Sequence, residues 1–210
     1  MQPRLPLVVV ATEAERPRAF AGEVLVCGVG KSAAAVATAT RLAQGGVAGV
    51  VSFGVAGAYP ASGLALGDVA VATEVAVLDE GLGTARGFRP FERPGMPVPA
   101  AAWTATDALL RAPFAGDGDG FRVALGRVAT VSVCAGTDRL VRERSATGAL
   151  AEGMEGAAIA LACARHGVPF AELRGISNPC GPRDGAPFDL ALAVAHASAV
   201  LARRGGSGAP

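Results

Sequence analysis

The stretch VLVCGVGKSAAAVATATRLAQGGVAGVVSF, residues 24–53, decides the fold. It begins with the short, continuous apolar run Val24–Gly28, as expected of a buried strand. Ser32–Ala43 is predicted to form a helix, and Val47–Phe53 is a second apolar run. A strand, a helix and another strand in this order indicate an α/β protein.

The same alternation continues on both sides of this stretch. The further predicted strands are Leu5–Ala11, Asp68–Leu78, Phe121–Val133 and Pro169–Ser177. The further predicted helices are Trp103–Arg111, Asp138–Thr147, Glu155–His166 and Phe188–Arg204, and the connections include Gly54–Gly57, Asp79–Pro99, Gly116–Gly120 and Asn178–Pro187. We therefore predict one three-layer α/β domain over residues 1–204, with a mixed central sheet flanked by helices, and a disordered tail at Gly205–Pro210.

Composition narrows the class of protein. Charged residues make up 18% of the 210 residues and hydrophobic ones 51%, which suits a sheet buried on both faces. The formal net charge of +1 gives no reason to expect a nucleic-acid or membrane partner. The cysteines show no CxxC spacing, and we see neither a signal peptide nor an apolar run of transmembrane length, so we expect a cytoplasmic protein.

Ligands of α/β proteins bind at the carboxyl ends of the strands. That rule predicts a cleft formed by Glu13–Glu15, Gly54–Gly57, Thr137 and Asn178. A carboxylate in such a cleft can act as a base. The alternative for Glu13 and Glu15 is that they open a helix, where the helix dipole favours acids.

Two later segments also carry polar groups among apolar neighbours. In Glu152-Gly153-Met154-Glu155-Gly156, Glu155 could bind two sugar hydroxyls and Met154 could pack on a sugar face, unless Glu155 is only an exposed capping acid. In the strand that follows, Glu172 and Arg174 lie two residues apart and point to the same face. If that face is buried, the two side chains must form a pair.

One glycine-rich segment resembles a phosphate-binding loop but lacks part of the motif. Gly28-Val29-Gly30-Lys31-Ser32 matches its end, yet Leu25 stands where the motif needs another glycine. We therefore interpret it as a tight turn from a strand into a helix.

Taken together, these motifs resemble one known group of enzymes. Met154-Glu155-Gly156-Ala157-Ala158 followed by Arg174-Gly175-Ile176-Ser177-Asn178 is similar to the nucleoside phosphorylase and nucleosidase superfamily, and the resemblance covers nearly the whole chain. With the later Pro182-Arg183-Asp184, the sequence most resembles the futalosine hydrolase branch. The resemblance implies a homo-oligomeric enzyme that cleaves the N-glycosidic bond of a purine nucleoside.

The resemblance also implies roles for individual residues. Glu15 matches the glutamate that activates water, and Met154 and Glu155 match the ribose-binding pair. Asn178 matches the base-recognising position, which is Asp in the adenine-specific nucleosidases. The predicted substrate-binding set also contains Val55, Ala56 and Gly57, although Val55 replaces a serine and so loses its side-chain contact. Gly153 stands where Asn or Glu is more usual.

A neutral amide at position 178 favours hypoxanthine over adenine as the leaving group. It can donate to N7 or O6 of a 6-oxopurine, but it cannot protonate N7 of an adenine. Methylthioadenosine nucleosidase, purine nucleoside phosphorylase and a non-catalytic nucleoside sensor remain the alternatives. We expect no metal and no cofactor, because His166 and His196 lie far apart on separate helices.

Overall fold

The centre of the molecule is a mixed β-sheet. The computed structural model describes residues 5–85, 87–90 and 104–203. The strands of the main sheet are β1 (Leu7–Val10), β2 (Val24–Val26), β3 (Val50–Ala58), β4 (Val69–Val77), β7 (Thr104–Ala105), β8 (Val123–Thr130), β9 (Ala149–Gly153) and β10 (Phe170–Pro179). The helices are α1 (Lys31–Ala43), α2 (Ala108–Arg111), α3 (Asp138–Ser145), α4 (Gly156–His166) and α5 (Leu190–Ala202).

The strands run in the order β10-β4-β8-β9-β3-β1-β2, and β10 also pairs with β3. This extra pairing closes β3, β10, β4, β8 and β9 into a ring. Most neighbours are parallel, whereas β4 is antiparallel to β10 and β9 is antiparallel to the end of β3. The predicted mixed sheet is confirmed.

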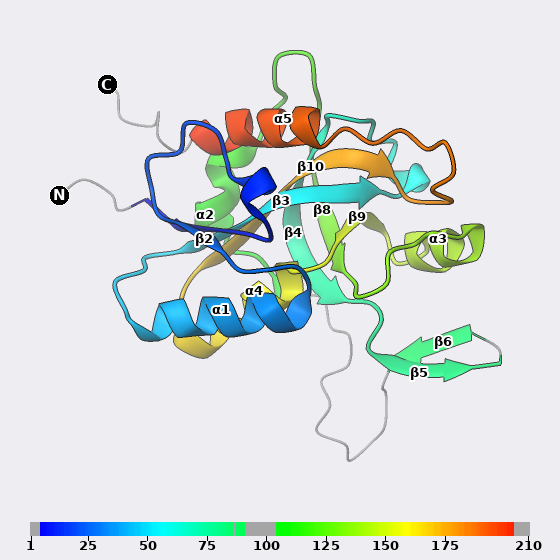
Figure 1. Cartoon of the computed structure of the whole chain (residues 1–210), viewed down its shortest axis with the longest axis horizontal. Helices are drawn as coiled ribbons and strands as arrows, with labels where there is room; N and C mark the ends of the chain where they lie inside the picture. Colours follow the sequence, from blue (N-terminus) through cyan, green and yellow to red (C-terminus); the bar gives the residue numbers. More distant parts are fainter. Residues whose placement is uncertain (1–4, 86, 91–103, 204–210) are drawn as a thin grey trace.

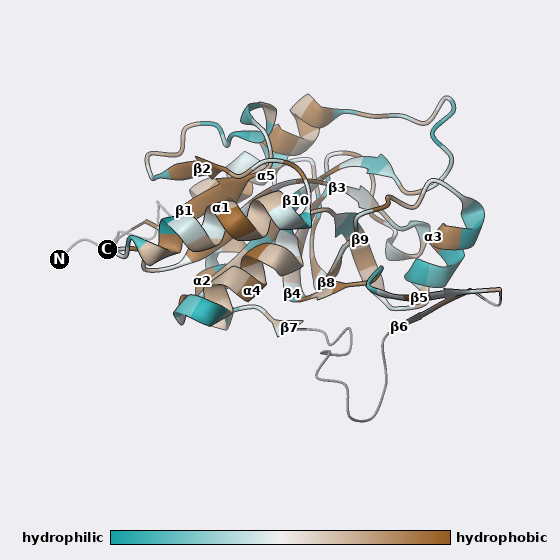
Figure 2. Cartoon of the chain, turned by 60° about the horizontal axis from the view of Figure 1, so that its bottom comes forward, coloured by the Kyte–Doolittle hydropathy of each residue, from teal (hydrophilic) through white to brown (hydrophobic). Residues whose placement is uncertain are grey.

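Helices cover the sheet on two sides, as Figure 1 shows, with α1 and α4 together on one side and α5 on the other. β1 shows why both faces are apolar: Leu7 and Val9 pack toward α1 and α4, while Val8 and Val10 pack toward α5. In Figure 2 hydrophilic colouring is conspicuous on α3, while the ribbons of α1 and α4 are mostly pale to brown. The predicted three-layer α/β fold is therefore correct.

Three predicted segments differ from the structure. Gly54–Gly57 is not a loop, because β3 runs through it to Ala58. A strand that we did not predict, β9, lies between the helices α3 and α4. Only Ala108–Arg111 of the predicted helix 103–111 is α-helical, because Thr104 and Ala105 pair with β4 instead.

Other element ends shift by a few residues. β10 extends to Pro179, so Asn178 lies inside the strand rather than after it. α5 begins at Leu190, and Asp189 caps it by accepting a hydrogen bond from the backbone N–H of Leu192. The irregular segment predicted at 79–99 contains a hairpin of β5 (Gly81–Thr84) and β6 (Gly87–Pro90), while residues 91–99 and the predicted disordered tail Gly205–Pro210 lie outside the described residues.

No helix in the described residues is long and apolar enough to cross a membrane.

The contact between α5 and β10 generates a stability prediction. A Cβ at Gly175 would collide with the backbone carbonyl of Ala193, so only glycine lets this helix lie so close to the strand. We expect Gly175→Ala to lower the free energy of unfolding by about 2–3 kcal/mol, because neither backbone can give way. Gly83→Ala is the matched control, since a Cβ there meets nothing within 4 Å, and it should change stability by less than about 0.5 kcal/mol. Urea unfolding of both variants tests this; equal midpoints would contradict the packing argument.

Candidate functional site

A cavity of about 190 Å³ opens at the carboxyl ends of β1, β3 and β10. Its wall contains every residue of the predicted catalytic and substrate-binding set: Glu15, Val55, Ala56, Gly57, Met154, Glu155 and Asn178. Thr137, which we predicted as a neighbour, is not in the wall; its side chain caps α3 by accepting from the backbone N–H of Leu140. What each residue does in a reaction stays a prediction.

A second cavity of about 240 Å³ lies at the opposite end of β10, beside Phe170. It is larger, but it contains none of the residues that the sequence singled out. The cavity at the carboxyl ends is therefore the candidate site.

Glu15 is held in the cavity wall by backbone and side-chain donors. One carboxylate oxygen accepts from the Val55 N–H at 3.1 Å, and the other accepts from the Thr12 N–H at 3.1 Å and the Thr12 hydroxyl at 3.2 Å. Glu15 also belongs to a short 3₁₀ helix, Glu13–Glu15. The alternative interpretation, that these acids open a helix, is therefore correct as well. Glu13 instead pairs with Arg16 in solvent, so only Glu15 reaches the cavity.

Arg174 is a charged side chain behind the cavity wall, and it is 1% exposed. Its Nε lies 2.7 Å from Glu172, its Nη2 donates to the Ser52 hydroxyl at 2.8 Å, and its Nη1 lies 3.7 Å from Glu155. The predicted pairing of Glu172 with Arg174 is confirmed. Burial alone would lower the pKa of Arg174, but Glu172 and Glu155 raise it, so the guanidinium stays charged. Burial raises the pKa of Glu172, against the opposing effect of Arg174.

Two glycines allow the carboxylates to approach this arginine. A Cβ on Gly54 would lie 2.6 Å from Glu15 Oε1 and 2.7 Å from Arg174 Nη1, so Glu15 and the guanidinium both lie against Gly54. A Cβ on Gly156 would collide with the carboxylate of Glu172. The start of α4 and the middle of β3 therefore need glycine for close packing.

Glu155 precedes α4 but does not cap it with its side chain. The residue is 5% exposed, and its Oε1 accepts from the Gly30 N–H at 2.9 Å. The alternative of an exposed capping acid is therefore wrong. The same contact shows that the Gly28–Ser32 turn presents an amide to a carboxylate of the protein, while Lys31 pairs with Asp79 at 2.8 Å.

Gly153, which stands where Asn or Glu is more usual, lies beside the guanidinium of Arg174. A Cβ at this position would lie 3.5 Å from Arg174, so an acid there could reach the guanidinium. Here Glu172 from β10 is the partner instead.

The amide of Asn178 has a fixed orientation. Its Oδ1 accepts from the Ser177 hydroxyl at 2.9 Å, and its Nδ2 donates to the Pro179 carbonyl at 2.8 Å. One N–H of the amide is left for a ligand.

Sequence reasoning missed several residues of the cavity wall. They are Ala11, Val29, Cys134, Glu152, Gly153, Ser177, Arg183 and Phe188. Arg183 had a signal in Pro182-Arg183-Asp184, and Glu152 stood in the quoted segment before α4, but neither was given a role.

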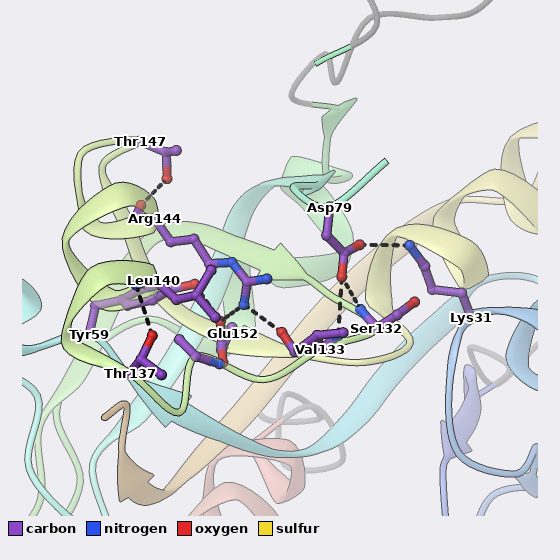
Figure 3. A network of polar contacts seen from close by, with 11 residues as sticks. Lys31, Tyr59, Asp79, Ser132, Val133, Thr137, Leu140, Arg144, Thr147 and Glu152 are labelled. Carbon is purple, nitrogen blue, oxygen red and sulfur yellow. Dashed lines mark hydrogen bonds and ion pairs between the residues drawn. The ribbon is translucent and has the colours of Figure 1, made fainter. Parts of the chain in front are cut away.

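Glu152 is the centre of a second buried network, shown in Figure 3. One of its oxygens accepts from the Ala135 N–H at 2.6 Å, and the other accepts from the Tyr59 hydroxyl at 2.6 Å and from Arg144 at 2.9 Å. Arg144 also donates to the Val133 carbonyl at 2.7 Å. The network therefore fixes the segment 131–136, which brings Cys134 to the cavity.

The same segment is held from its other side by Asp79 (Figure 3). The Asp79 carboxylate accepts from the backbone N–H groups of Ser132 and Val133 and pairs with Lys31. Burial would raise the pKa of Asp79, but Lys31 and these N–H groups hold it below its usual value.

Comparison with known proteins places this arrangement in a family. The family model of the phosphorylase superfamily matches residues 20–205. The chain belongs to the phosphorylase superfamily. Within that superfamily it is 40% identical to a futalosine hydrolase of Streptomyces coelicolor, over 82% of this chain and 74% of the relative. It is 37% identical to a futalosine hydrolase of Thermus thermophilus, over 89% of this chain and 84% of the relative.

A solved structure from the superfamily has the same fold. It is the 5'-methylthioadenosine/S-adenosylhomocysteine nucleosidase of Neisseria meningitidis in complex with methylthio-immucillin-A. The two structures align with a TM-score of 0.75 at 26% identity, over 94% of this chain and 96% of the other.

The network around Glu152 generates a prediction. Arg144→Met should lower the free energy of unfolding by about 3–5 kcal/mol, because Glu152 would keep a buried charge without its cationic partner. Arg139→Ala, on the exposed side of the same helix, should cost less than about 1 kcal/mol. Urea unfolding measures both. If the two variants were equally stable, the Arg144–Glu152 pair would not support the segment 131–136.

Proposed function

We propose that this protein hydrolyses the N-glycosidic bond of futalosine and releases hypoxanthine, as a step of menaquinone biosynthesis. The observation that carries the proposal is that one cavity contains both a buried carboxylate, Glu15, and a neutral amide, Asn178. The identity of 40% to a futalosine hydrolase supports the same substrate.

Glu15 is the proposed base. It would take a proton from a water molecule as that water attacks the anomeric carbon, while the bond from that carbon to the purine breaks. The donors from Thr12 and Val55 orient its carboxylate toward the cavity. Arg174 lies beside it across Gly54 and balances the negative charge that gathers there.

Met154 and Glu155 are the proposed ribose contacts. One oxygen of Glu155 is engaged by Gly30, and its Oε2 lies 3.7 Å from Arg174. A carboxylate offers about four lone-pair sites, so it retains acceptors for two sugar hydroxyls. Its charge also stabilises the cationic character that the sugar develops as the bond breaks.

Asn178 is the proposed contact to the base. Because Ser177 and Pro179 fix its amide, the remaining N–H can donate to N7 of the purine. An adenine leaving group would need a proton at N7, which an amide cannot supply. The methylthioadenosine nucleosidases are therefore the second candidate rather than the first.

Phosphorolysis is less well supported by the charges at the site. A phosphate in the attacking position would meet the Glu15 carboxylate, and Arg174 is already engaged by Glu172 and Ser52. Arg16, which is close in sequence, pairs with Glu13 in solvent.

The test is hypoxanthine release from futalosine in phosphate-free buffer. Release at a rate that added phosphate does not change supports hydrolysis and rejects both a phosphorylase and a sensor. A higher kcat/KM for methylthioadenosine than for futalosine would replace the proposal with the methylthioadenosine nucleosidase.

Glu15→Gln keeps the shape of the side chain and removes the base. We expect kcat to fall by about two to four orders of magnitude, which is the usual contribution of a general base. Glu13→Gln is the control, because this neighbouring carboxylate faces solvent and pairs only with Arg16 among the described residues. Near-normal turnover in a folded Glu15→Gln enzyme would remove Glu15 from the mechanism.

We also propose that the enzyme is cytoplasmic, as cysteine usage and the missing signal peptide indicated, and that it self-associates, as the sequence resemblance implied. The free thiols of Cys27, Cys163 and Cys180 are buried, which fits a reducing compartment. Light scattering of the purified protein measures the oligomeric state.

A further inference from the structure

Arg183 is a cation at the rim of the cavity that the proposed mechanism does not use. Its side chain belongs to the wall of the cavity together with Asn178, five residues earlier in the chain. Arg183 is exposed, and within residues 5–85, 87–90 and 104–203 no carboxylate pairs with it. The buried arginines Arg174 and Arg144, by contrast, are engaged by acids.

Backbone hydrogen bonds place the start of the Arg183 loop at the Asn178 end of the cavity. The Cys180 N–H donates to the Ala58 carbonyl at 2.7 Å, and the Gly181 N–H donates to the Ala135 carbonyl at 2.9 Å. A Cβ on Gly57 would lie 3.0 Å from both Asn178 Nδ2 and Cys180 Sγ, so the amide and this thiol are neighbours. The acids Glu15 and Glu155 instead gather around Arg174.

The pKa shifts of the nearby thiols agree with a position of Arg183 at the Asn178 end of the cavity. Burial raises the pKa of Cys134 and of Cys180, and Arg183 is among the charges that oppose this rise at both. Burial and then Glu155 raise the pKa of Cys27 to about 11, and Arg174 opposes this rise. Arg183 therefore lies close enough to Cys134 and Cys180 to act on both, whereas Arg174 acts on Cys27; Glu155 acts on both Cys27 and Cys134.

We propose that Arg183 is a specificity-determining residue that donates hydrogen bonds to O6 of a 6-oxopurine leaving group. The inference rests on the proposed function and deepens it. A guanidinium has five N–H donors and no acceptor, so it fits the O6 acceptor and has nothing to offer the 6-amino group of adenine. Arginine recognises the same O6 and N7 edge of guanine in DNA. Here Asn178 would donate to N7 while Arg183 donates to O6.

The same contact would assist departure of the base. When the bond to the anomeric carbon breaks, its electron pair goes to the purine, and the proton of the attacking water goes to Glu15. The negative charge on the purine spreads onto O6 and N7, where the hydrogen bonds from Arg183 and Asn178, respectively, stabilise it. The purine anion then takes its proton from solvent, because the amide of Asn178 donates a hydrogen bond but does not transfer its proton.

A cation at the rim could instead bind the carboxylate of the substrate. The two products of the reaction distinguish this role from the contact to O6. Hypoxanthine carries O6 but no carboxylate, whereas the sugar product of futalosine carries the carboxylate and no purine. Calorimetric titration of each product, and of adenine, into wild type and Arg183→Ala measures the two ends of the site independently. Arg139→Ala is the matched control, because it removes an exposed arginine that is not part of the cavity.

We expect Arg183→Ala to bind hypoxanthine about 10- to 100-fold more weakly, with adenine and the sugar product bound as in wild type. The kcat/KM for futalosine should fall by at least the same factor. Unchanged hypoxanthine binding would overturn the inference, and weaker binding of the sugar product alone would assign Arg183 to the substrate carboxylate instead. A wild-type protein that binds hypoxanthine through Arg183 but does not cleave futalosine would reject the proposed function and retain only the contact between Arg183 and a 6-oxopurine.

Discussion

The buried guanidinium of Arg174 is the constraint on which the rest of the site depends. A charge that is 1% exposed must be matched by nearby partners, and Glu172, Ser52 and Glu155 supply them. Leaving either member of such a pair alone typically costs about 3–5 kcal/mol. This requirement brings β3, β10 and the start of α4 together, and the close approach needs glycine at 54 and 156.

The proposed roles divide the site into a part for chemistry and a part for recognition of the purine. Glu15 and Glu155 are held by backbone amides and lie beside the arginine, so their positions follow from the packing of the sheet. The end of the cavity proposed to hold the purine consists of the end of β10, the loop with Arg183, and the segment 131–136. Glu152 and Asp79 hold that segment from opposite sides by accepting hydrogen bonds from its backbone, although it forms no strand (Figure 3).

Much of this architecture was predictable from local sequence, and the exceptions have physical causes. The pairing of Glu172 with Arg174 follows from strand alternation and burial alone. Ala149–Gly153 contains no β-branched residue, so its strand conformation is decided by distant partners on β3 and β8. Gly54 indicated a loop, yet it serves a close approach inside a strand. Arg183 could not be assigned, because its place beside Asn178 depends on how the loop is bonded to Ala58 and Ala135.

The ring formed by β3, β10, β4, β8 and β9 has a consequence for motion. Each of these strands has a bonded neighbour on both sides along part of its length, so their amides should exchange with solvent only when most of the molecule opens. Glu172, Arg174 and Asn178 lie on β10, one of these strands, and should therefore keep their register during local opening. Segments outside the ring, such as the exposed loop that carries Arg183, would then have to move to admit substrate and release product.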